Sequence, residues 1–118
     1  DIISARKLSL RSSGGSDMHL EVEVSDLDIE CRGGSDVIIS GTAEKLTAST
    51  SGGSDLKGFD LIVDEADLQS SGGSDIHIHV VERLKASASG GSDIGYRGNP
   101  EIINIESSSS ADVEKAKD

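Results

Sequence analysis

The sequence has little of what usually stabilises or anchors a small domain. Its 118 residues include one cysteine, one proline, one tyrosine, one phenylalanine and no tryptophan. A single cysteine excludes an internal disulfide framework and a zinc site built from cysteines. No apolar run approaches the roughly 18 residues of a membrane-spanning helix, so no membrane span is expected. The chain has 11 basic and 22 acidic side chains. This excess of acidic residues argues against nucleic acid as a partner, because phosphates are bound by Lys and Arg.

Glycine, in contrast, is abundant and marks a repeat. Apolar residues make up only 34% of the chain and charged residues 28%, a balance that by itself is typical of disorder. However, Gly-Gly-Ser-Asp occurs five times, and a degraded sixth copy, Ser-Ser-Ala-Asp, ends at Asp112. The complete copies end at Asp17, Asp36, Asp55, Asp75 and Asp93, and the six aspartates follow at intervals of 19, 19, 20, 18 and 19 residues. Such an internal repeat indicates a stack of equivalent structural units.

Apolar residues keep a fixed place relative to each copy. One column directly follows the aspartate: Met18, Val37, Leu56, Ile76, Ile94 and Val113. Two more lie six and four residues before the first glycine: Leu8, Leu27, Leu46, Ala66 and Leu84, then Leu10, Ile29, Ala48, Leu68 and Ala86. Alternation with period two is typical of strands with one buried face. The sequence therefore predicts an all-β, right-handed parallel β-solenoid of about six 19-residue coils over residues 1–106, then a Ser-rich coil remnant and polar tail over 107–118.

The glycine pairs are expected to form the corners of the coils, because glycine can adopt positive φ or let backbones pack closely. They are Gly14, Gly15, Gly33, Gly34, Gly52, Gly53, Gly72, Gly73, Gly90 and Gly91. The alternative, a flexible Gly/Ser linker, lacks fixed apolar columns on both sides. An extra residue near Phe59 predicts a bulge or protruding loop, and Gly98-Asn99-Pro100 predicts a turn.

The repeated Gly-Gly-Ser-Asp-apolar copies and the segment Asp93-Ile94-Gly95-Tyr96-Arg97-Gly98-Asn99-Pro100 resemble the bacterial putative auto-transporter adhesin family, the head GIN domain. In that family, small-residue-Ser-Asp corners repeat through a β-helical domain, and a Tyr-x-Gly-Asn-Pro stretch precedes a Ser-rich end. The resemblance implies an exported, cell-surface bacterial protein with an adhesive role, no enzyme activity, no catalytic residues and no cofactor. It also implies an additional N-terminal half, so this chain is expected to be the back half of such a domain.

The stacked aspartates are the sharpest candidates for chemistry. Carboxylates about 4.8 Å apart repel by about 1 kcal/mol per pair even in water. We expect each to accept hydrogen bonds from backbone N–H groups at its corner, with the preceding serine adding a hydroxyl donor. The alternative is a calcium ladder with Asp17, Asp36, Asp55, Asp75 and Asp93 as ligands. Because the full nonapeptide motif of calcium β-rolls is missing, no metal site is predicted.

Other reactive residues have ordinary structural interpretations. His77 and His79 lie two residues apart on one strand without a third zinc ligand, so a solvated strand face is expected, as for His19. Cys31 falls in a narrow inward column and is expected to be a small buried hydrophobe rather than a nucleophile. One cluster in the irregular coil could place acids for polysaccharide cleavage: Phe59, Asp60, Asp64 and Glu65.

The favoured function is a non-enzymatic, extracellular surface module whose regular face binds a glycan or a protein. We expect a contiguous exposed patch around Phe59, Leu61 and Tyr96. The alternatives are a calcium-stabilised structural scaffold and, less favoured, a polysaccharide-active enzyme, which needs convergent carboxylates of perturbed pKa in a cleft. Because the chain begins inside a coil, its uncapped N-terminal end is expected to pair with another copy.

Overall fold

The computed structural model describes residues 2–15, 17–107 and 112–115, which form eight strands. The strands are β1 (Ile2–Ser12), β2 (Asp17–Cys31), β3 (Asp36–Thr50), β4 (Asp55–Ser70), β5 (Asp75–Ala88), β6 (Asp93–Arg97), β7 (Ile102–Ser107) and β8 (Asp112–Lys115). The described residues contain no helix that could cross a membrane. Within the Ser-rich coil remnant and polar tail predicted over 107–118, residues 108–111 and 116–118 lie outside the described residues.

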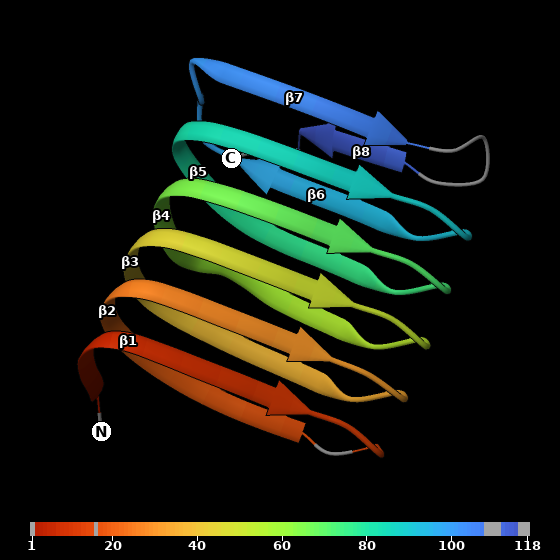
Figure 1. Cartoon of the computed structure of the whole chain (residues 1–118), viewed down its shortest axis with the longest axis horizontal. Helices are drawn as coiled ribbons and strands as arrows, with labels where there is room; N and C mark the ends of the chain where they lie inside the picture. The colour runs from red at the N-terminus through yellow and green to blue at the C-terminus, as the bar shows by residue number, and fades with distance from the viewer. Residues whose placement is uncertain (1, 16, 108–111, 116–118) are drawn as a thin grey trace.

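All strand pairs are parallel, and the chain winds into a stack of coils. The strand order is β1-β2-β3-β4-β5-β6-β8, with β7 paired to β5. Figure 1 shows why the strands are long: each of β2–β5 crosses one face of the stack, bends at a rounded edge and returns across the opposite face to a tight corner. The predicted parallel β-solenoid of about six coils is confirmed.

The stack of coils has two broad faces. The first face consists of the first halves of β2–β5 together with β6 and β8, because β6 pairs with residues 75–79 of β5 and β8 pairs with β6. The second face consists of the second halves of β1–β5 together with β7, which pairs with residues 83–88 of β5. The core lies between these two faces.

The register places equivalent residues of successive coils side by side. Met18 pairs with Val37, Val37 with Leu56, and Leu56 with Ile76. Each aliphatic side chain in the middle of the stack is therefore covered by its equivalents in the coils before and after it, and Leu56 and Leu68 are fully buried. This stacking explains how a chain with only 34% apolar residues builds a continuous core.

Each described Gly-Gly pair lies in the left-handed region, with φ between 65° and 80°, which residues with a Cβ rarely adopt. A Cβ on the first glycine of a corner would also lie close to the backbone of the preceding coil. It would lie 3.0 Å from the nitrogen of Gly72 at Gly90, and 3.1 Å from the nitrogen of Gly33 at Gly52. The corners therefore stack at a distance that leaves no room for a side chain there.

In the corners whose serine the structure describes, this serine, and not the aspartate, satisfies the polar backbone of the turn. The described corner serines are all fully buried: Ser35, Ser54, Ser74 and Ser92. The Oγ of Ser54 lies 2.8 Å from the carbonyl oxygen of Ser51 and 3.1 Å from that of Cys31, and it accepts from the N–H of Ser51 at 3.2 Å.

The expected hydrogen bonds from corner N–H groups to the aspartate side chains are absent among the described residues, which corrects that prediction. The physical reason is alternation along the strand: the serine points into the corner, so the aspartate after it points outward. The backbone N–H of Asp55 donates instead to the carbonyl of Ser35 in the preceding coil, at 2.9 Å.

The second face carries a column of alternating charge beside the bend. In register order, its members are Lys7, Asp26, Lys45, Glu65 and Arg83. Glu65 lies 3.9 Å from Lys45 and 3.5 Å from Arg83, measured between its carboxylate oxygens and their side-chain nitrogens. Exposed ion pairs contribute about 0.2–1 kcal/mol each, so the column adds modestly to stability.

Both ends of the stack leave apolar side chains incompletely covered. At the N-terminal end these pack against the core and stay partly exposed: Ile3, Leu8, Leu10, Met18 and Leu20. At the other end, Ile102, Ile103 and Ile105 of β7 are 52%, 46% and 40% exposed. The self-association predicted at the N-terminal end stays a prediction.

Candidate functional site

An irregularity in β4 brings one aromatic side chain to the outer surface. Gly58 pairs with Ile78 and Ile62 pairs with His79, so three residues of β4 lie between positions that are consecutive in β5. The predicted bulge in this coil is confirmed. It leaves Phe59, its first residue, partly exposed on the first face.

The burial of Leu61 and Tyr96 corrects the prediction of an exposed patch at Phe59, Leu61 and Tyr96. Leu61 is 0% exposed and Tyr96 is 8% exposed, so neither contributes to a surface patch. An extra residue in a strand reverses the face to which the subsequent side chains point, and Leu61 enters the core beside its β3 partner Gly41. Tyr96 pairs with Ile78 in an inward column. Of the three residues, Phe59 alone remains at the surface.

Two contacts hold the Phe59 ring in place. The guanidinium carbon of Arg97 lies 4.2 Å from the ring centroid, which is within the range of a cation–π contact. The His77 ring centroid lies 4.8 Å from that of Phe59, with the two planes tilted by 47°. The buried Nε of Arg97 has no hydrogen-bond partner, and its guanidinium group packs on the ring. Phe59 and His77 together form an aromatic wall.

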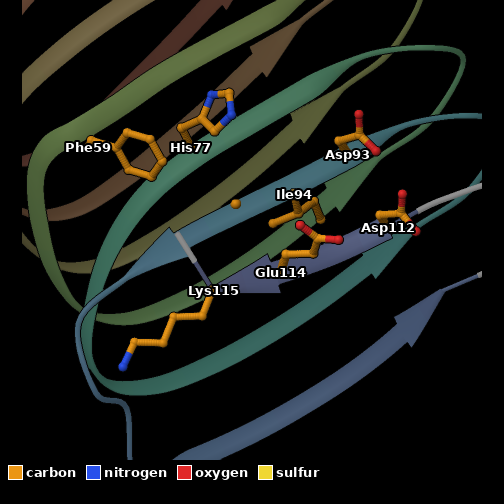
Figure 2. A pocket seen from close by; sticks show the side chains of 8 residues that line it. Phe59, His77, Asp93, Ile94, Asp112, Glu114 and Lys115 are labelled. Carbon is orange, nitrogen blue, oxygen red and sulfur yellow. The ribbon is translucent and has the colours of Figure 1, made fainter. Parts of the chain in front are cut away.

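A hollow of about 370 Å³ lies beside this wall on the first face (Figure 2). We call it the Phe59 hollow, and it is lined by Phe59, His77, Asp93, Ile94, Gly95, Asp112, Glu114 and Lys115. Gly95 pairs with His77 on one side and with Glu114 on the other. A Cβ on Gly95 would lie 2.9 Å from Cδ2 of His77 and 3.6 Å from Cζ of Phe59. The missing side chain of Gly95 therefore helps to create the hollow.

The opposite side of the Phe59 hollow carries three carboxylates. Asp93 and Asp112 are register partners in β6 and β8, and Glu114 points to the same face because it lies two residues after Asp112. Figure 2 shows the aromatic rings on one side and the three carboxylates on the other. Such a site suits a ligand that has both an apolar face and hydrogen-bond donors.

Two basic side chains line the Phe59 hollow: His77, which packs against the Phe59 ring, and Lys115. The ammonium group of Lys115 donates a hydrogen bond to Oδ1 of Asn99. In Figure 2, this side chain points away from the carboxylates of Asp93, Asp112 and Glu114. None of the ion pairs among the described residues involves these three carboxylates.

Sequence reasoning missed most of this site, although a signal was present. Gly95 stood out only through the family resemblance, and Glu114 was not a candidate at all. The outward column that contains Gly95 has a side chain in every other described coil: His19, Ile38, Lys57, His77 and Glu114. A glycine at an outward strand position, away from any corner, is the pattern that could have pointed to a hollow.

The six aspartates do form a column on the first face, since each pairs in register with the next from Asp17 to Asp112. Burial raises the pKa of Asp75, and the charges of Asp55 and Asp93 on either side raise it further. No group of three or more His, Cys, Asp or Glu side chains in the described part of the chain is placed to hold a metal ion. The calcium ladder therefore gains no support from the geometry.

Replacing Asp75 with asparagine should stabilise the fold at neutral pH. A carboxyl whose folded-state pKa is raised binds its proton more tightly when folded, so the stability it contributes at low pH is lost as the pH rises through that pKa. Asp75→Asn removes the charge and should raise Tm at neutral pH by on the order of 2 °C. The gain should shrink as the pH falls below the raised pKa of Asp75.

Thermal melts followed by circular dichroism from acidic to neutral pH check this prediction. Asp28→Asn is the matched control, because it removes one charge from the second face, where Asp28 pairs with Ser9 and Thr47. A Tm for Asp75→Asn at or below that of the wild type at neutral pH would contradict the expected repulsion.

Cys31 lacks the surroundings of a nucleophile. Burial raises the pKa of its thiol to about 11, with smaller contributions from the charges of Asp36 and Glu30. A thiol with such a pKa stays protonated at neutral pH, and the thiolate is the reactive form. Cys31 is fully buried in the column that also contains Ser12 and Thr50, as predicted.

The acidic cluster of the irregular coil does not act as a unit. Asp60 and Asp64 are exposed, whereas Glu65 lies beyond the bend in the alternating charge column, paired with Arg83.

His79 pairs in register with Arg97 and approaches Gly98, at which a Cβ would lie 3.2 Å from its ring. His19 is exposed.

The sequence matches a known family over most of its length. A family model described as "Putative auto-transporter adhesin, head GIN domain" matches residues 1–100. Three residues that line the Phe59 hollow, Asp112, Glu114 and Lys115, lie outside the matched residues. No curated protein matches the sequence.

Solved structures share the fold at low sequence identity. A putative adhesin from Bacteroides fragilis NCTC 9343 has a TM-score of 0.94 at 20% identity, over 98% of this chain and 54% of the other. A putative adhesin from Parabacteroides merdae ATCC 43184 has a TM-score of 0.87 at 24% identity, over 99% and 49%. A putative lipid binding protein from Parabacteroides distasonis ATCC 8503 has a TM-score of 0.78 at 19% identity, over 98% and 57%. This chain thus spans about half the length of these proteins.

Proposed function

Because this chain belongs to the putative auto-transporter adhesin family, we propose that it acts as a non-enzymatic adhesion module outside the cell, with a surface glycan as its partner. The family and the shared fold of the putative adhesins support the adhesive role. The Phe59 hollow supports the choice of a glycan.

The observation that carries this proposal is an aromatic wall that faces carboxylates across a hollow. A sugar ring has an apolar face of C–H groups, which packs against aromatic side chains such as Phe59. Its hydroxyl groups donate hydrogen bonds to carboxylates, and Asp93, Asp112 and Glu114 are acceptors when ionised. The contacts of Phe59 with Arg97 and His77 hold the wall in place before a ligand arrives, which lowers the entropy cost of binding.

The size of the hollow also favours a glycan over a folded protein. At about 370 Å³, it lies near the lower end of small-ligand sites, which span about 300–1,000 Å³. A stable protein interface typically buries about 800 Å² on each partner. One sugar residue at the end of a longer chain fits a site of this size.

Loss of the aromatic wall should weaken glycan binding by about tenfold, equivalent to about 1.4 kcal/mol. The labelled protein is first screened on an array of surface glycans, and the strongest ligand is then titrated by calorimetry. Phe59→Ala removes the wall. Gly95→Val fills the hollow and keeps its three carboxylates, although the ring of His77, whose Cδ2 would lie 2.9 Å from the new Cβ, has to shift to make room. Valine also suits a strand.

The matched control is Ser49→Val, which places the same side chain at an exposed position of the second face. It should bind as the wild type does, and all three variants should keep the β-type circular dichroism spectrum. The proposal is wrong if the wild type binds no glycan, or if Gly95→Val keeps full affinity.

A further inference from the structure

We infer that the Phe59 hollow selects sugars with a free amino group, that is, hexosamines whose nitrogen is not acetylated. The inference rests on the proposed function, since it assumes that a sugar enters the hollow. It goes further because it names the chemical group that decides which sugar binds.

The first step is the unbalanced charge around the hollow. Asp93, Asp112 and Glu114 are exposed, and none of the ion pairs among the described residues involves any of them. Asp93 and Asp112 lie side by side as register partners, so their carboxylates repel each other. A positively charged ligand would relieve that repulsion, whereas an acidic sugar would increase it.

The second step concerns the basic side chains near the hollow, which make contacts with groups other than the three carboxylates. Lys115 donates to Asn99, and the guanidinium group of Arg97 lies over the Phe59 ring on the apolar side of the site. His77, which also lines the hollow, packs against the Phe59 ring. None of the three basic side chains forms an ion pair with the carboxylates, so an ammonium group of a ligand can lie beside them.

The third step is the geometry, which separates this site from a simple acidic patch. The missing side chain at Gly95 leaves a recess between the rings and the carboxylates. A sugar ring that packs against Phe59 and His77 directs its substituents across the recess toward Asp93, Asp112 and Glu114. An ammonium group there forms charge-assisted hydrogen bonds, which are roughly twice as strong as those of a neutral hydroxyl or acetamido group.

Calorimetry with two matched ligands tests the inference: short glucosamine oligomers and the same oligomers fully N-acetylated. The titrations are run at low salt and about pH 6, where an amino group of ordinary pKa is protonated. The wild type should bind the free-amine oligomer about tenfold more tightly than the acetylated one. That preference should fall as the salt concentration rises.

Two variants locate the preference in the hollow. Glu114→Gln should reduce the advantage of the free-amine oligomer and leave the affinity for the acetylated oligomer nearly unchanged. Gly95→Val keeps every charge and fills the recess, so it should weaken binding of both oligomers. Glu106→Gln is the matched control: it removes the same charge from β7 on the second face and should change neither affinity.

The outcomes separate this inference from the proposed function. Equal affinity of the wild type for both oligomers overturns the inference and leaves the glycan proposal intact. If neither oligomer nor any arrayed glycan binds, the proposed function itself fails. If Gly95→Val keeps the wild-type affinity for the free-amine oligomer, or if Glu106→Gln loses as much of the preference as Glu114→Gln, the preference comes from the acidic surface as a whole and the inference is wrong.

Discussion

Replacing Gly41 with alanine is expected to cost more stability than any other single substitution proposed for this protein. Gly41 has φ of 120°, a conformation that residues with a Cβ rarely adopt. An added Cβ would lie 1.9 Å from the carbonyl oxygen of Val22 and 2.9 Å from its carbonyl carbon. Both are backbone atoms of the neighbouring strand, so no side chain can turn aside to relieve the clash. We expect Gly41→Ala to lower the free energy of unfolding by about 3 kcal/mol or more.

Gly34→Ala is the control that separates the clash from the conformational strain. Gly34 also has positive φ, at 80°, but an added Cβ would meet no atom within 4 Å. It should therefore show only the cost of the left-handed conformation, about 1–2 kcal/mol. Urea unfolding followed by circular dichroism measures both. Equal losses in the two variants would show that the β2 and β3 backbones can separate at Gly41.

Replacing Ser74 with alanine is expected to have the second largest effect, a loss of about 2 kcal/mol. The Oγ of Ser74 lies 2.7 Å from the carbonyl of Ser71 and accepts a hydrogen bond from the hydroxyl of Thr50 at 2.9 Å. It also lies 2.7 Å from Oγ of Ser70. Ser74, Thr50 and Ser70 are all buried. The alanine variant removes the hydrogen bonds of the Ser74 hydroxyl to the carbonyl and the N–H of Ser71, while the hydroxyl of Thr50 keeps its 3.0 Å bond to Oγ of Ser70.

Ser49→Ala is the matched control for this variant, because Ser49 is exposed on the second face beside the buried Thr50. A substitution there should change stability by no more than about 0.5 kcal/mol. Denaturant unfolding at a single pH compares the two variants. A loss below about 1 kcal/mol for Ser74→Ala would mean that the remaining bond between Thr50 and Ser70 is enough to satisfy the corner.

The fold could be predicted from the sequence because the period of the repeat and the alternation within each strand together fix the place of each residue. A spacing of about 19 residues between aspartates fixes which residues meet in neighbouring coils, and the period of two fixes which of them point inward. The Met18–Val37–Leu56 column illustrates this: its members are adjacent by period and buried or partly buried by alternation.

The site could not be predicted in the same way, because it forms where the repeat fails. Along β4, the alternation rule breaks at the bulge, so alternation alone cannot assign Phe59 to the surface and Leu61 to the core. The recess at Gly95 depends on the absence of a side chain rather than on the presence of one. Glu114 joins the site because β8 pairs with β6, which places it beside Gly95.

The burial of Cys31 could be predicted from the sequence, but the residue that caps each corner could not. Burial of Cys31 followed from its inward column. The capping role was assigned to the aspartates because turns commonly use Asp, but Ser54 and its equivalents occupy the inward position and form those hydrogen bonds. Which of two adjacent polar residues caps a turn depends on the direction of its side chain, and local composition does not contain that direction.

The alternating charge column on the second face favours one order of the coils in the stack. Coils of nearly equal length and pattern could stack on the wrong neighbour, since the aspartate and aliphatic columns are the same in every coil. A coil that skipped its neighbour would bring Lys7 beside Lys45, and Asp26 beside Glu65, like charge against like. In the correct order, every one of these contacts is between opposite charges. Such contacts between like charges would destabilise the wrong order, so the column favours the native stacking of the coils.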